Sequence, residues 1–224
     1  MSKIYEIFCD DGVCSECQKY AGKFDQMPEH IPPFHPNCKC KIVEVEIEDI
    51  LEDLFDKLKE HEGGKRNAYT DTKGNVTIGY GSMFNDVEKF KKLPLYYENR
   101  LATPEEKEAE FYMLRDRKVK RGFLKLKNTE MKILALEHLN GDLKSVRKKF
   151  KEFDNLPRNA QLVILDMEYN MGANKFLPDE NKWPHFFDAI NKKDWIWAGN
   201  ESHSQDIQPS RNFWRKNMLH SIEE

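Results

Sequence analysis

Apolar residues recur at helical spacing directly after position 49. They form one stripe, namely Ile50, Leu51, Leu54, Phe55 and Leu58. This period predicts an amphipathic helix with a single buried face. Asp49 is the predicted N-cap. Gly63 and Gly64 are expected to end the helix, because glycine readily adopts the left-handed conformation found after helix C-termini. Glu62 is therefore expected at the last helical position.

The pattern changes to short strands after this helix. Residues 66–70 and 76–81 predict two strands of a hairpin. The turn between them contains Gly74 and Asn75, which both tolerate the positive φ of a tight turn. An alternating stretch at 40–47 predicts a further strand or an extended linker.

The remainder of the chain predicts helices. Thr103, Pro104 and Glu106 form a strong start, with an N-cap, a proline in the first turn and a capping box. Helices are expected at about 104–118, 129–138, 142–152, 157–171, 183–191, 193–199 and 209–222.

Composition narrows the class of protein. The chain has 224 residues, of which 36 are Lys or Arg and 39 are Asp or Glu, for a net charge of −3. This balance does not favour nucleic acid or an anionic membrane as a partner. No apolar run approaches the roughly 20 residues of a membrane-spanning helix, so no membrane insertion is expected. Mean hydropathy is −0.80, while 12% aromatic residues argue for a folded chain.

All five cysteines lie in the first 40 residues. This asymmetry predicts a small, loop-rich cysteine and histidine module at 1–45, followed by a second domain at 46–224. A module of this size has little core, so a metal or a crosslink is expected. The C-x₂-C pair and the later cysteines favour structural zinc, with His35 as a substitute ligand. The predicted ligands are Cys14, Cys17, Cys38 and Cys40. Disulfides, or a catalytic or redox metal, are the alternatives.

Two carboxylates in the predicted helix and hairpin suggest glycoside hydrolysis, which uses one acid to protonate the leaving oxygen and a second carboxylate to activate water. Glu62 ends the helix, Asp71 opens the hairpin turn, and Thr77 lies in the strand that leaves it. A helix end that faces a small hairpin places all three near one cleft.

This stretch resembles the phage-type lysozymes. Glu62, eight residues, Asp71, five residues, Thr77 and then Ile-Gly-Tyr-Gly follow one another with the spacing of that family. The segments 161–172 and 211–215 are also similar to it, so that the resemblance covers about residues 50–222. It implies an α+β fold, in which a mainly helical lysozyme-like domain carries a small β-hairpin sheet at the active-site cleft.

The resemblance implies an N-acetylmuramidase of peptidoglycan that cleaves the β-1,4 bond between N-acetylmuramic acid and N-acetylglucosamine with inversion and without a catalytic cofactor. Glu62 would be the general acid, with its pKa raised by burial, while Asp71 stays ionised and positions water together with Thr77. Asn170 is either a substrate-binding amide or a helix cap. Tyr169 either stacks on a sugar or packs in the core.

Arg211 and Arg215 would meet stem-peptide carboxylates or a buried acid. A lytic transglycosylase, which needs only the glutamate, and a non-enzymatic capsid or wall-binding protein are the rival interpretations.

The N-terminal segment resembles the C-terminal motif of Mu-like phage head morphogenesis proteins. It carries Cys14 and Cys17, then His35, Cys38 and Cys40. With no signal-peptide pattern at the N-terminus, synthesis in the cytoplasm is expected, and lysis or a secretion system would give access to the wall. The chain is thus expected to be an endolysin-like protein or a delivered antibacterial effector, for which a cognate immunity or inhibitor protein is a possible partner.

Overall fold

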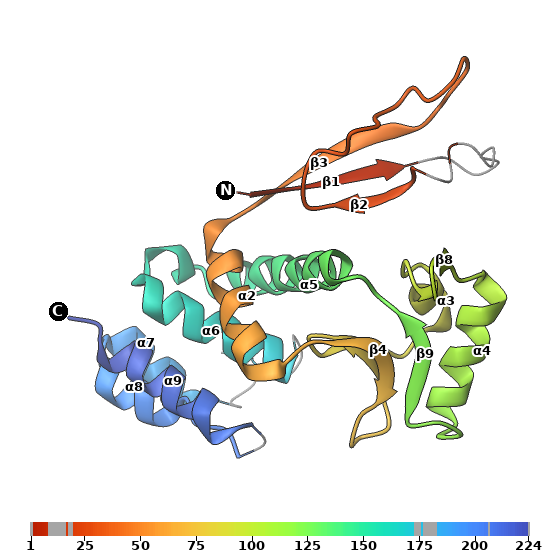
Figure 1. Cartoon of the computed structure of the whole chain (residues 1–224). Coiled ribbons are helices and arrows are strands. Elements are labelled where there is room, and N and C mark those ends of the chain that lie inside the picture. The colour runs from red at the N-terminus through yellow and green to blue at the C-terminus, as the bar shows by residue number, and fades with distance from the viewer. Residues whose placement is uncertain are drawn as a thin grey trace. The chain divides into compact units, whose positions relative to one another are not determined.

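A computed structural model of the chain shows an α+β protein, in which about half of the described residues are helical and the strands form two antiparallel sheets (Figure 1). The structure describes residues 2–8, 17, 20–172, 176, 183–205 and 207–223. The chain divides into two compact units. The first comprises Met1–Asp49 and Glu62–Leu136, and the second comprises Ile50–His61 and Glu137–Glu224.

The N-terminal sheet contains three strands in the order β2-β1-β3. They are β1 (Ser2–Phe8), β2 (Gly22–Phe24) and β3 (Lys41–Ile47). The central strand β1 pairs with β3 along its whole length, from Ser2 opposite Ile47 to Phe8 opposite Lys41. The strand predicted at 40–47 is confirmed, and it continues two residues past the expected boundary at 45. The segment 2–8, expected to be loop, is a strand because β3 provides its hydrogen-bonding partner.

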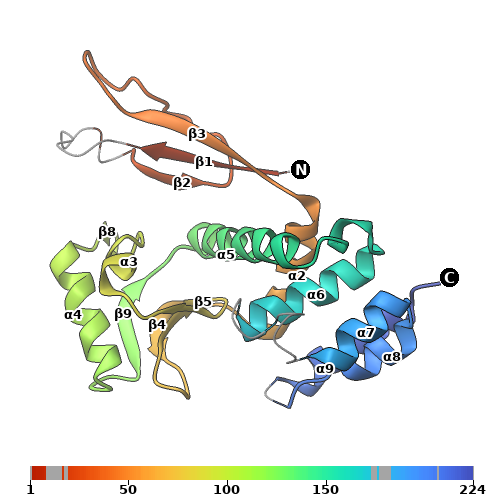
Figure 2. The same ribbon diagram turned by 180° about the vertical axis from the view of Figure 1, so that it is seen from behind.

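A second sheet has six strands in the order β6-β5-β4-β9-β7-β8. Its strands are β4 (Lys65–Thr70), β5 (Val76–Gly79), β6 (Ser82–Phe84), β7 (Tyr96–Tyr97), β8 (Arg100–Leu101) and β9 (Arg121–Lys125). The predicted hairpin is confirmed as β4 and β5, with Tyr69 opposite Thr77. The opposite edge of β4 pairs with β9, a strand that the sequence did not predict (Figure 2).

Two helices of the first unit belong with this sheet, α3 (Val87–Lys91) and α4 (Pro104–Arg115). The capping box of Thr103 and Glu106 is confirmed. Glu110 of α4 is buried, and its Oε2 accepts hydrogen bonds from the backbone N–H groups of Phe123 and Leu124 at 2.5 and 2.8 Å. Burial raises the pKa of Glu110. This carboxyl group therefore fastens β9 to α4.

Helix α2 (Asp49–Glu62) buries all five apolar residues of its predicted stripe. Its N-cap is Glu48, so the prediction of Asp49 was wrong by one residue. Gly63 follows the helix with φ of 55°, the left-handed conformation that ends it. Gly64 is needed for a different reason, since a Cβ atom there would lie 2.7 Å from the ring of Tyr80.

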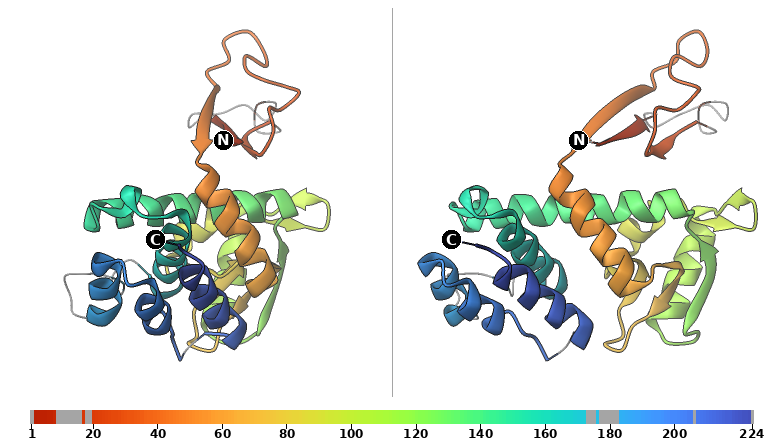
Figure 3. Two further views of the ribbon diagram at one scale, coloured as in Figure 1. Left: turned by 90° about the vertical axis from the view of Figure 1, so that its left-hand side faces the viewer. Right: turned by 60° about the vertical axis from the view of Figure 1, so that its left-hand side comes forward.

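The second unit is helical. It contains the C-terminal part of α5 (Asn128–Lys149), the short η1 (Phe153–Asn155), α6 (Arg158–Met171), α7 (Pro184–Lys192), α8 (Trp195–Glu201) and α9 (Pro209–His220). The helices α7, α8 and α9, blue in Figure 3, lie side by side. One helix α5 replaces the two predicted at 129–138 and 142–152, because Gly141 weakens a helix without ending it. Among the described residues, no helix combines the length and apolar character needed to cross a membrane.

A buried ionic cluster joins α6 to α9. Asp166 accepts from Arg211 Nη2 at 2.6 Å and from Arg215 Nε at 2.6 Å, and all three side chains are almost completely buried. Both arginines therefore have the structural role that the sequence left open beside a role in substrate binding.

Replacing Asp166 with asparagine should destabilise the protein by about 3–5 kcal/mol, because two arginines would remain buried without a counter-charge. Chemical denaturation measures this loss. Asp53→Asn is the matched control, since its ion pair with Arg158 is exposed and is expected to contribute less than about 1 kcal/mol. Equal effects of the two substitutions would contradict the prediction.

The close contact between Gly64 and Tyr80 makes a second prediction. Gly64→Ala should destabilise the fold by about 1–3 kcal/mol, because the added methyl group overpacks the ring. Gly141→Ala should instead stabilise it by about 0.5–1 kcal/mol, since a Cβ atom at this helical position meets nothing within 4 Å. Thermal unfolding should give a lower melting temperature for Gly64→Ala and a higher one for Gly141→Ala. A Gly64→Ala variant as stable as the wild type would refute the packing argument.

Candidate functional site

Glu62 occupies the last position of α2, as expected, but its side chain is exposed. The expectation that this carboxyl group is buried was wrong. The reason is local: the helix ends at Gly63, and the next residue after Gly64 already belongs to β4. Glu62 therefore lies at a helix terminus that faces solvent.

Asp71 begins the turn between β4 and β5 and closes that turn with its own carboxylate. Its Oδ1 accepts from the backbone N–H of Asn75 at 2.7 Å, and its Oδ2 accepts from the Asn75 side-chain amide at 3.0 Å. Partial burial opposes ionisation, but hydrogen bonds from Asn75 and from the N–H groups of Lys73 and Gly74 lower the pKa of Asp71 below its ordinary value. Asp71 is therefore ionised near neutral pH.

Thr77 is buried in β5, where it lies opposite Tyr69 of β4. Its hydroxyl donates to the carbonyl oxygen of Asn75 at 3.4 Å. The same asparagine thus contacts both Asp71 and Thr77. The sequence identified Asn75 only as a turn residue, although its place between the two candidate residues is the feature that links them.

Tyr69 of β4 is related to each of the three candidate residues. Partial burial raises the pKa of its hydroxyl, and the negative charges of Glu62 and Asp71 raise it further. Both carboxylates are therefore close enough to Tyr69 to interact with it, while Thr77 is its cross-strand partner. Tyr69 was not among the residues predicted from the sequence. Its position two residues before Asp71, near the end of β4, is the pattern that could have identified it.

Asn170 and Tyr169 lie at the end of α6 in the helical unit. The side-chain amide of Asn170 donates to the carbonyl oxygen of Asp166, one turn earlier in the same helix, at 2.6 Å. The ring of Tyr169 lies 5.1 Å from that of His138. These contacts give each residue a structural role, and their predicted roles in substrate binding stay predictions.

The N-terminal module contains a group that can hold a metal ion. The ligand atoms of Cys17, His35 and Cys38 all lie within 4.8 Å of one another. The Cys17 sulfur is 3.0 Å from His35 Nε2 and 3.8 Å from the Cys38 sulfur. A turn in which the Cys38 N–H donates to the His35 carbonyl oxygen at 3.1 Å brings the last two ligands together. A hydrogen bond from the backbone of Phe34 is the main cause of a lowered Cys38 pKa.

The predicted ligand set is corrected at Cys40. This residue is disulfide-bonded, whereas Cys17 and Cys38 form no disulfide. A disulfide sulfur has no thiolate to offer a metal, and His35, the predicted substitute, belongs to the group in its place. The predicted ligand Cys14 lies outside the described residues. A group that could hold a metal ion and a disulfide, considered as alternatives from the sequence, thus both occur in this module.

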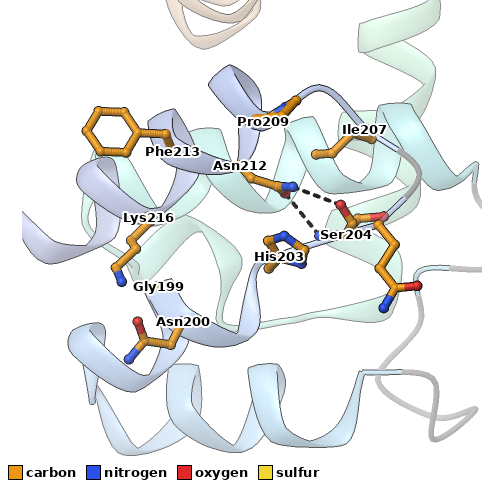
Figure 4. A pocket seen from close by; sticks show the side chains of 10 residues that line it. Gly199, Asn200, His203, Ser204, Ile207, Pro209, Asn212, Phe213 and Lys216 are labelled. Atoms are coloured by element: carbon orange, nitrogen blue, oxygen red, sulfur yellow. Dashed lines mark hydrogen bonds between the residues drawn. The ribbon is translucent and has the colours of Figure 1, made fainter.

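A hollow of 470 Å³ lies in the helical unit between α8 and α9 (Figure 4). Asn212 lines it, and its amide is held by two hydrogen bonds with the backbone of Ser204, at 2.8 and 3.0 Å. The hollow contains none of the residues that the sequence selected.

Two acids are buried between α5 and α6 in the same unit. Glu168 accepts from Ser145 at 2.9 Å and from Lys149 at 3.3 Å. Its second oxygen and Oδ2 of Asp142 are buried with no hydrogen-bond partner among the described residues. Burial, together with the charge of Glu168, raises the pKa of Asp142 to about 7.

A search of protein-family models finds no match to this chain, and a search of curated proteins finds none either.

The raised pKa of Asp142 predicts a specific pH dependence of stability. The folded protein binds more protons than the unfolded chain between about pH 4 and pH 7, so the free energy of unfolding should fall as the pH rises through this range and level off above it. Asp142→Asn should remove most of this fall, which is at most about 4 kcal/mol at roughly 1.4 kcal/mol per pKa unit. Denaturation at pH 4.5 and pH 8 provides the measurement. Asp188→Asn, at an exposed ion pair with Lys192, should leave the dependence in place, and an unchanged slope in Asp142→Asn would refute the assignment.

Proposed function

We propose that this protein is a peptidoglycan hydrolase, an N-acetylmuramidase with a lysozyme-like catalytic domain. The observation that carries the proposal is the hairpin geometry, in which Tyr69 lies opposite Thr77 and two residues before Asp71. Burial raises the pKa of Tyr69, and the charges of Glu62 and Asp71 raise it further. The spacing from Glu62 to Gly81, which resembles that of the phage-type lysozymes, supports the same function. Glycosidases need two carboxyl groups beside one scissile bond.

The proposed roles follow from the contacts of each side chain. Glu62, at the exposed end of α2, donates a proton to the leaving glycosidic oxygen. Asp71 is ionised and already accepts hydrogen bonds from Asn75, Lys73 and Gly74 within the turn. In the proposed mechanism its negative charge orients the attacking water. Thr77, the cross-strand partner of Tyr69, lies on the neighbouring strand and assists in placing that water.

One observation favours a second candidate, a lytic transglycosylase. Both oxygens of Asp71 already accept hydrogen bonds within the turn, so part of the hydrogen-bonding capacity of this carboxylate stabilises the hairpin. A transglycosylase needs no attacking water, because the sugar closes on its own hydroxyl group. In that mechanism Glu62 would act alone, and Asp71 would be a turn residue.

The group of Cys17, His35 and Cys38 supports a further part of the proposal, namely structural zinc in the N-terminal module. Thiolate and imidazole ligands are those that zinc prefers in structural sites. Cys17 is buried, and His35 and Cys38 follow one another in a turn. Bound zinc would tie the segment around Cys17 to the segment 35–38.

Glu62→Gln should lower the rate of peptidoglycan hydrolysis by at least about a hundredfold, because the amide keeps the shape but has no acidic proton. Release of soluble fragments from purified peptidoglycan measures the rate, with the melting temperature as a check on folding. Glu60→Gln is the matched control, since Glu60 is exposed on the same helix and pairs only with Lys57 among the described residues. Full activity of Glu62→Gln would remove Glu62 from the mechanism.

The products separate the two candidate reactions. Mass spectrometry of fragments from the wild-type protein should show reducing N-acetylmuramic acid ends and no anhydro ends, because water is the proposed nucleophile. Asp71→Asn should reduce this hydrolysis by a large factor. Anhydro products together with an active Asp71→Asn variant would establish the transglycosylase instead, and no cleavage at all would favour a wall-binding protein without activity.

The purified protein should contain about one zinc ion per chain, and Cys38→Ser or His35→Ala should lose it. Elemental analysis with a thiol titration provides the test. Lys39→Gln, beside the ligands but without a ligand atom in the group, should keep the metal. Metal-free wild-type protein with its thiols intact would refute the zinc assignment.

A further inference from the structure

A strongly basic hollow of 590 Å³ lies on the six-stranded sheet, against β4 and β9. Five cationic side chains line it, namely Lys65, Arg66, Lys120, Arg121 and Lys125, and no acidic residue does. All five are exposed. In a chain with a net charge of −3, this concentration of positive charge is local.

Within the described part of the chain, none of these five cations forms a salt bridge. Lys65 instead places its ammonium group 3.9 Å from the centre of the Tyr69 ring. Arg66 donates its Nε–H to the carbonyl oxygen of Leu126 at 2.8 Å. Their charges are therefore available to an anionic ligand.

A buried amide orients one of these cations. Asn67 donates to the carbonyl oxygens of Gly122 and Leu124, each at 3.1 Å, and so holds the backbone of β9. Its Oδ1 accepts from Arg121 Nη2 at 2.8 Å. Arg121 is thereby fixed on one side, while the rest of its guanidinium group can form the paired hydrogen bonds that a carboxylate accepts.

Tyr69 relates the hollow to the candidate carboxylates. It lines the hollow, lies opposite Arg121 in the pairing of β4 with β9, and precedes Asp71 by two residues. Burial raises the pKa of this tyrosine, and the charges of Glu62 and Asp71 raise it further. Along β9, Arg121, Phe123 and Lys125 alternate with buried residues and share one exposed face. A ligand in the hollow would therefore lie beside the proposed catalytic residues and touch cationic and aromatic groups.

We propose that this hollow binds the carboxylates of the peptidoglycan stem peptide. This inference rests on the proposed function and adds a specificity to it. The stem peptide is attached to the muramic acid residue whose glycosidic bond would be cleaved, so a site for its carboxylates has to lie next to the catalytic groups. The cations supply charge, and the fixed Arg121 supplies directional hydrogen bonds.

The neighbouring acids make nucleic acid a poor ligand for this hollow. A strand of closely spaced phosphates laid over Tyr69 would bring its charges against Glu62 and Asp71 as well as onto the lysines. A neutral glycan with a short anionic branch avoids this repulsion, because its charges are confined to the branch. The arrangement of charges thus favours the stem peptide.

The first experiment measures binding of a soluble tetrapeptide, alanyl-glutamyl-diaminopimelyl-alanine, to the full chain by calorimetry. Lys120→Gln/Lys125→Gln should weaken binding at least about tenfold, since the substitution removes two charged hydrogen-bond donors from the hollow. Lys89→Gln/Lys92→Gln is the matched control, because it removes two exposed lysines from the same unit outside the hollow. Equal binding by the wild type and the hollow variant would overturn the proposal, as would tighter binding of a single-stranded oligonucleotide or of inorganic phosphate.

The second experiment compares hydrolysis of intact peptidoglycan with hydrolysis of glycan strands from which an amidase has removed the peptides. The wild type should prefer the peptide-bearing substrate through a lower KM, and the hollow variant should lose this preference while the control variant keeps it. A wild type without any preference would overturn the inference but leave the muramidase proposal standing. If the wild type hydrolyses neither substrate, the proposed function fails, and the tetrapeptide measurement still tests the hollow by itself.

Discussion

Two glycines separate the last residue of α2 from the first residue of β4, and this short connection constrains the whole candidate site. Gly63 turns the chain with a positive φ of 55°, and Gly64 lets it pass against the ring of Tyr80. A longer or bulkier connection would move Glu62 away from the strand that carries Tyr69. The position of Glu62 relative to the hairpin is therefore set by backbone conformation and packing at these two glycines.

The hairpin turn then favours the ionised form of Asp71, the residue that follows β4. Asn75 donates from its backbone and side chain to Asp71, and its carbonyl oxygen accepts from Thr77. These bonds stabilise the turn and at the same time favour the ionised form of Asp71. Under the proposed function, Asp71 would combine a structural and a catalytic role, so a loss of activity on its substitution has to be separated from a loss of the turn.

The parts of the fold that local rules govern were predictable from the sequence. The stripe of α2, the hairpin of β4 and β5, and the capping box at Thr103 each depend on residues close together in the chain. The strands β1 and β9 depend on distant partners, β3 for one and β4 with Glu110 for the other, so no local pattern announced them. In the site, spacing identified Glu62, Asp71 and Thr77, but the exposure of Glu62 and the contribution of Tyr69 required three-dimensional structure. The disulfide at Cys40 could not be assigned from spacing, because both thiols and disulfides fit the same cysteine pattern.

Opposite charges are separated along a single strand. β4 begins with Lys65 and Arg66 beside the basic hollow, and it leads through Tyr69 to the carboxylate of Asp71. A glycan strand looks nearly the same in every repeat, so sugar contacts alone would allow it to bind in several registers. An anionic branch would be attracted to the β9 side of this strand and repelled from the turn. Under the proposed function, this asymmetry would place one type of glycosidic bond beside Glu62, because electrostatic complementarity fixes the register of a bound chain more than it increases its affinity.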